Sequence, residues 1–126
     1  MSTDAGAGGE IGRHVLADLL DVPEPRYFAA DFLAGAFRDA LASGGATIRR
    51  FIVEEFDGGG LSILVVLAES HASLHTWPER RAILVDVFTC GPLAPLSVVE
   101  HLAARLGGSR LRVATVERGV SAAPVG

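Results

Sequence analysis

The segment from Glu69 to Glu79, ESHASLHTWPE, concentrates side chains that can do chemistry. It contains hydroxyls, imidazoles and carboxylates, and the only thiol of the chain, Cys90, follows shortly after it. Globular interiors do not collect such groups by chance, because each buried polar atom needs a partner. A hydroxyl next to an imidazole can act as a nucleophile once a base activates it. The segment is therefore predicted to be an active site.

Each of these residues also admits an ordinary structural role. Ser70 could satisfy a turn at a strand end, His75 could be a structural histidine, and Cys90 could be a small buried hydrophobe. The segment lacks the Gly-x-Ser-x-Gly elbow of many hydrolases. Residues at even spacing share one face of a strand, so geometry alone does not exclude a metal at His71 and His75. The chain has no cysteine pair and no His-Glu-x-x-His motif, and no metal site is predicted.

Length and composition narrow the class of protein. The 126 residues predict one domain, and the 49% hydrophobic and 21% charged residues predict a globular one. The net charge of −4 and the absence of a long basic run argue against a nucleic-acid partner. No stretch approaches the roughly 18 apolar residues of a membrane span, and no export signal is evident. A single cysteine fits a reducing compartment, so a cytoplasmic protein is expected.

Apolar periodicity predicts the secondary structure. Helices are predicted over 24–43 and 95–106, where apolar residues recur every three or four positions and a glycine pair follows. Residues 11–21 fit a helix or a strand, and a strand is favoured because Pro23 and Pro25 end it quickly. The remaining strands are predicted over 47–56, 61–68, 73–77, 82–88 and 110–115, with residues 57–60 as a hairpin turn. Residues 1–10 and 120–126 are predicted to be tails of a domain spanning 11–119.

The order β-α-β-β-β-β-α-β predicts an α+β fold. Tight turns pair strands antiparallel, and two amphipathic helices can cover only one face of the sheet, which gives a two-layer α/β sandwich. The apolar run at 61–68 suggests burial on both sides. The second sheet face is therefore expected to meet another chain, most simply in a homodimer or a higher homo-oligomer.

The whole string closely resembles the prokaryotic S-adenosylmethionine decarboxylase proenzyme family. The likeness lies in ESHASLHTWPE and in VDVFTCG at 85–91, and it extends to GRH at 12–14, GATI at 45–48, EHL at 100–102 and VERG at 116–119. It thus covers about residues 11–119. The resemblance implies the fold of that family and a self-processing, pyruvoyl-dependent enzyme. Such an enzyme decarboxylates S-adenosylmethionine, and the product is the aminopropyl donor for spermidine biosynthesis.

The resemblance also implies roles for the reactive residues. The Ser70 hydroxyl would attack the Glu69 carbonyl, and elimination and hydrolysis would leave a pyruvoyl group at the new N-terminus. His75 matches the processing histidine of the family, and Ser62 matches the serine that assists it. The substrate amine would then form a Schiff base with the pyruvoyl carbonyl, and loss of CO2 would leave a stabilised carbanion. Cys90 matches the acid that reprotonates the α-carbon.

Cleavage would give a β fragment, residues 1–69, and an α fragment, residues 70–126. Phe56 matches the aromatic residue that stacks on adenine, although it could also be a core residue of a hairpin. Glu79 matches the carboxylate that accepts hydrogen bonds from the ribose hydroxyls, although it could also be a solvated turn charge. The family dimerises with its active sites at the subunit interface.

The chain departs from the family pattern at Arg80 and Arg81, which replace a Tyr-Gly pair. These guanidinium groups could pair with Glu79 or point to solvent. Two alternatives therefore stay open: a pyruvoyl-dependent decarboxylase of L-ornithine or L-arginine on the same scaffold, and a homologue that is never processed.

Overall fold

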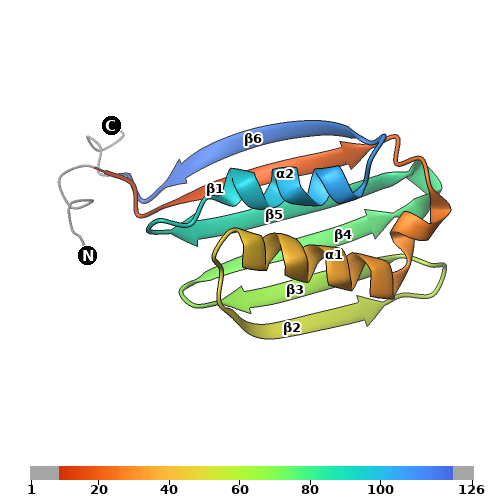
Figure 1. Ribbon diagram of the computed structural model, residues 1–126, viewed down its shortest axis with the longest axis horizontal. Helices are drawn as coiled ribbons and strands as arrows, with labels where there is room; N and C mark the ends of the chain where they lie inside the picture. Colours follow the sequence, from red (N-terminus) through yellow and green to blue (C-terminus); the bar gives the residue numbers. More distant parts are fainter. Residues whose placement is uncertain (1–8, 121–126) are drawn as a thin grey trace, which may run out of the picture.

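The computed structural model describes residues 9–120 and contains a six-stranded antiparallel sheet (Figure 1). The strands lie in the order β2-β3-β4-β5-β1-β6. Their bounds are β1 (Gly12–Leu20), β2 (Ile48–Glu55), β3 (Leu61–Leu67), β4 (Ser70–Trp77), β5 (Ala82–Cys90) and β6 (Arg110–Arg118). Most of the two predicted tails, residues 1–8 and 121–126, falls outside the described residues.

Two helices, α1 (Ala30–Ser43) and α2 (Pro95–Arg105), cover one face of this sheet (Figure 1). Each helix buries one apolar stripe, which includes Phe37 of α1 and Leu102 of α2, both fully buried. They pack on alternate residues of the central strands, such as Ile63 and Leu74, because successive strand residues point to opposite faces. The predicted two-layer α+β sandwich, with both helices on one side, is confirmed.

The other face of the sheet, which we call the open face, has no covering layer among the described residues. In β3 the odd-numbered residues from Leu61 to Leu67 are buried, but Leu64 and Val66 are 49% and 47% exposed. Leu16 of β1 lies on the same face and is 45% exposed. The apolar run at 61–68 is thus buried on one side only within this chain. Among the described residues, no helix has the length and apolar character needed to cross a bilayer.

The first helix begins later than the sequence predicts. Pro25–Phe28 forms a short 3-10 helix, Ala29 is extended, and α1 starts only at Ala30 rather than at residue 24. The break lets Tyr27, which is buried, stack on Phe32 with ring centroids 5.2 Å apart. In a continuous α-helix these two residues would point about 140° apart and could not stack.

The strand predicted over 73–77 is longer and begins at Ser70. Ser70 pairs with Leu67 across a turn of only two residues, Ala68 and Glu69. The prediction was wrong at this end because the polar sequence from Glu69 to His71 hides the alternation that marks a strand. Ser70 consequently has a fixed backbone at the first position of β4.

Candidate active site

The turn between β3 and β4 positions the Glu69–Ser70 peptide bond. Glu69 has a φ of 64°, a left-handed conformation that side chains other than glycine and asparagine rarely adopt. A backbone hydrogen bond to a neighbouring segment stabilises the turn, since the Ala68 N–H donates to the Thr47 carbonyl oxygen at 3.0 Å. The peptide bond before Ser70 therefore lies at a tight, constrained corner at one end of the sheet.

Cys90, the last residue of β5, lies against this peptide bond. Its Sγ donates to the Glu69 carbonyl oxygen at 3.4 Å, and it lies 3.9 Å from the Ser70 Oγ. The pairing of β4 with β5 brings these groups together from positions about twenty residues apart in the sequence. A carbonyl that accepts a hydrogen bond, with a hydroxyl beside it, is an arrangement suited to nucleophilic attack on that carbonyl.

His75 pairs with Ser62 on the open face. The two residues are directly opposite in the β3–β4 register, and Ser62 Oγ lies 2.7 Å from His75 Nδ1. This contact fixes the orientation of the imidazole ring and leaves Nε2 available to another group.

A pocket of about 420 Å³ adjoins this pair. Phe56, Ser62, His75, Trp77 and Glu79 are among its lining residues. The Phe56 side chain is 53% exposed, so it is not a core residue of the hairpin. An exposed aromatic ring and a carboxylate on one pocket suit a ligand that has both a flat ring and hydroxyl groups.

The two arginines that follow Glu79 are not among the residues that line this pocket. Arg80 and Arg81 are exposed, and among the described residues neither forms an ion pair with Glu79. Arg80 instead lines a neighbouring hollow with Asp18 and Leu84. The arginines could have paired with Glu79 or pointed to solvent, and in the structure they are exposed to solvent.

The predicted site residues thus fall into two groups at opposite ends of β4. We call Glu69, Ser70 and Cys90 the cleavage group, and Phe56, Ser62, His75 and Glu79 the pocket group. Ser70 and His75 are five residues apart on one strand, which corresponds to about 17 Å. Within one chain, His75 is not a neighbour of the Ser70 hydroxyl.

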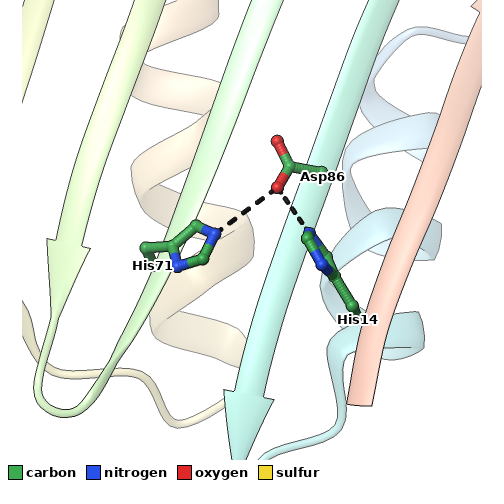
Figure 2. Close-up of side chains that lie close together, drawn as sticks. All are labelled: His14, His71 and Asp86. Atoms are coloured by element: carbon green, nitrogen blue, oxygen red, sulfur yellow. Dashed lines mark hydrogen bonds and ion pairs between the residues drawn. The ribbon is translucent and has the colours of Figure 1, made fainter. Parts of the chain in front are cut away.

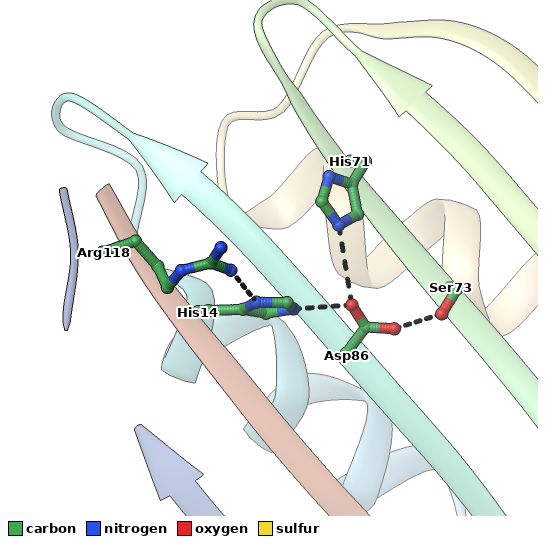
Figure 3. Close-up of polar contacts among 5 residues, drawn as sticks. All are labelled: His14, His71, Ser73, Asp86 and Arg118. Atoms are coloured by element: carbon green, nitrogen blue, oxygen red, sulfur yellow. Dashed lines mark hydrogen bonds and ion pairs between the residues drawn. The ribbon is translucent and has the colours of Figure 1, made fainter. Parts of the chain in front are cut away.

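A polar cluster on the open face was not assigned a role from the sequence (Figure 3). His14 Nε2 lies 2.7 Å from Asp86 Oδ2, and the Ser73 hydroxyl donates to Asp86 Oδ1. Arg118 Nη1 lies 3.2 Å from His14 Nδ1, and His71 Nε2 lies 3.7 Å from Asp86 Oδ2. These residues come from four strands, so only the strand register reveals that they meet.

Comparisons with known proteins show which family this chain resembles. The family model described as S-adenosylmethionine decarboxylase matches residues 13–119. A protein named S-adenosylmethionine decarboxylase proenzyme from Geobacillus kaustophilus is 34% identical over 110 residues, covering 87% of this chain and 89% of that protein. One of the same name from Clostridium tetani is 31% identical over 116 residues, covering 91% and 92%.

The fold is similar to a solved structure as well. The crystal structure of the adenosylmethionine decarboxylase from Aquifex aeolicus superposes with a TM-score of 0.81 at 28% identity, covering 93% of this chain and 98% of that one. Sequence and fold thus lead to one family.

Proposed function

Because this chain belongs to the S-adenosylmethionine decarboxylase family, we propose that it cleaves itself before Ser70 and then decarboxylates S-adenosylmethionine. The observation that carries the proposal is the contact of the Cys90 thiol with the Glu69 carbonyl, beside the Ser70 hydroxyl. The name proenzyme, which the relatives bear, supports the self-processing step. Their shared substrate name favours S-adenosylmethionine over L-ornithine or L-arginine.

The cleavage step exchanges an amide for an ester. Ser70 Oγ attacks the Glu69 carbonyl carbon while the Cys90 thiol donates to the carbonyl oxygen. The bond from that carbon to the Ser70 nitrogen breaks, and the proton of the hydroxyl ends on the freed amine. Elimination then releases the Glu69 carboxylate and leaves dehydroalanine at position 70. Water converts the dehydroalanine to a pyruvoyl group and ammonia.

The backbone of Glu69 supports this step. A left-handed residue other than glycine costs about 1–2 kcal/mol, and the φ of 64° puts Glu69 in that class. Strain of this kind persists where the surrounding structure enforces it, as β3 and β4 do here. Cleavage opens the turn and removes the constraint, so the strain favours the forward reaction.

The mature site draws on both groups of residues. The pyruvoyl group supplies a carbonyl that accepts the electron pair left when CO2 departs. Cys90 lies beside position 70 and can deliver a proton to the substrate α-carbon. The ring face of Phe56 suits both an adenine and a sulfonium cation, and Glu79 can accept hydrogen bonds from ribose hydroxyls.

One chain does not bring these two groups together, so we propose that the active unit is a homodimer. Two copies packed open face to open face, with their strands running in opposite directions, would set each cleavage group against the pocket group of the other copy. Leu16, Leu64 and Val66, each nearly half exposed, would be buried by this contact. A two-fold axis makes both contacts identical, as in most homodimers.

Intact-mass spectrometry of the purified chain, beside a Ser70→Ala variant, tests the proposal. We expect two fragments, 1–69 and 70–126, with the second blocked to N-terminal sequencing, and an uncut variant. Release of CO2 from carboxyl-labelled S-adenosylmethionine, ornithine and arginine then tests the substrate. A full-length chain unchanged by the variant would favour a homologue that is never processed. Cleavage with CO2 release from ornithine or arginine alone would refute only the substrate.

A further inference from the structure

Three potential metal ligands converge on the open face (Figure 2). They are His14 of β1, His71 of β4 and Asp86 of β5, and their ligand atoms all lie within 4.8 Å of one another. The three strands are neighbours in the sheet, and the register sets the two histidines on either side of β5 in one row. Both imidazoles therefore approach the same carboxylate oxygen, Asp86 Oδ2.

We propose that His14, His71 and Asp86 bind a divalent transition-metal ion of the zinc class. Two imidazoles and a carboxylate are ligands that Zn²⁺ takes readily at about 2.0–2.1 Å. Around a tetrahedral ion, such ligands lie about 3.3 Å apart. The distances of 2.7 Å and 3.7 Å from Asp86 Oδ2 to the two Nε2 atoms lie on either side of that value. Mg²⁺, which prefers six oxygen ligands, does not suit this set.

The surroundings orient two of the ligands. The Ser73 hydroxyl donates to Asp86 Oδ1, which turns the other oxygen, Oδ2, toward the histidines. The Phe88 ring lies beside both imidazoles, with centroids 5.7 Å from His14 and 5.6 Å from His71. The His71 side chain is 53% exposed within the single chain.

Arg118 acts against metal binding in the present arrangement. Its Nη1 lies 3.2 Å from His14 Nδ1, and a guanidinium can only donate. The proton of a neutral His14 is therefore on Nε2, where it is donated to Asp86. Binding of the ion requires that this proton move to Nδ1 and that the Arg118 guanidinium move away from His14. Removal of Arg118 should therefore strengthen metal binding.

Titration calorimetry of the tag-free protein with ZnCl2, and with MgCl2 as the control salt, tests this site. We expect one Zn²⁺ per chain and no binding of Mg²⁺. His71→Ala and Asp86→Asn should weaken Zn²⁺ binding by more than about 100-fold. Loss of a residue that only supports a ligand weakens binding by about 10- to 100-fold, so a larger effect identifies a direct ligand. The matched control His101→Ala removes a histidine of α2, beyond the other face, and should bind like the wild type. Arg118→Ala should bind more tightly.

The proposal is overturned if the wild type binds no Zn²⁺ at one per chain. It is also overturned if binding survives unchanged in His71→Ala and Asp86→Asn, or is lost in Cys90→Ser, which would locate the ion at the thiol. Because the readout is binding, the result does not depend on cleavage or on decarboxylation.

Discussion

Two chains, each lacking a different reactive residue, should restore cleavage when they are combined. His75→Ala removes the imidazole of the pocket group, and Ser70→Ala removes the hydroxyl of the cleavage group. If His75 acts on the Ser70 of the other copy, a mixed dimer contains one complete site. That site joins the Ser70 of the first variant to the His75 of the second, so it cuts the His75→Ala chain.

The expected extent of cleavage follows from the geometry of β4. Ser70 and His75 lie about 17 Å apart along β4, whereas direct proton transfer needs about 3 Å. Neither variant alone should therefore be cut efficiently. With equal amounts and random pairing, about half of the dimers are mixed, because the two-fold contact is the same in every pair. About half of the His75→Ala chains should be cut, and none of the Ser70→Ala chains.

Coexpression of the two chains, one carrying a small mass label, allows each to be followed by intact-mass spectrometry. A partner that carries both Ser70→Ala and His75→Ala is the matched control, and it should rescue nothing. The reasoning would be refuted if the His75→Ala chain were cut to the same extent alone, with the control partner and with the Ser70→Ala partner. His75 would then act within its own chain or have no part in cleavage.

Three further predictions follow from single contacts. Ser62→Ala removes the 2.7 Å contact with His75, worth about 0.5–1.5 kcal/mol, so the cleavage rate in a gel time course should fall about 2- to 13-fold. Leu64→Arg puts a charge in the open face, so light scattering should report a monomer that does not cleave. Glu69→Ile, made in the Ser70→Ala chain, should lower the free energy of unfolding in urea by at least about 1 kcal/mol, because a β-branched residue tolerates a φ of 64° poorly. Glu69→Gly should not lower it.

The fold was largely predictable because its signals are local. The spacing of apolar residues depends on 3.6 residues per helical turn and two per strand repeat, and both helices and β6 carry it. Several other strands are marked by β-branched or apolar residues bounded by glycines or prolines. The start of α1 could not be predicted, since the contact of Tyr27 with Phe32 is tertiary and breaks the helix at Ala29. The start of β4 was missed because Ser70 and His71 are polar.

The candidate site residues could be named from the sequence, but their arrangement in space could not. Ser70 and His75 are close in the sequence, and the extended strand drives them apart. Ser70 and Cys90 are distant in the sequence, and the pairing of β4 with β5 brings them within 3.9 Å. His14 and Asp86, 72 residues apart, meet only because β1 inserts between β5 and β6. Register and strand order are long-range properties, which one sequence does not reveal by periodicity.

On the roles proposed for Ser70 and His75, cleavage requires assembly of two copies. If Ser70 is the nucleophile and His75 its base, the two cannot meet within one chain, because they lie about 17 Å apart along β4. The antiparallel packing of a second copy is the simplest arrangement that supplies the base, and it also covers Leu16, Leu64 and Val66. The open face would then serve stability and catalysis at once. On this argument an isolated chain remains uncut, so the cofactor forms only where a complete site already exists to use it.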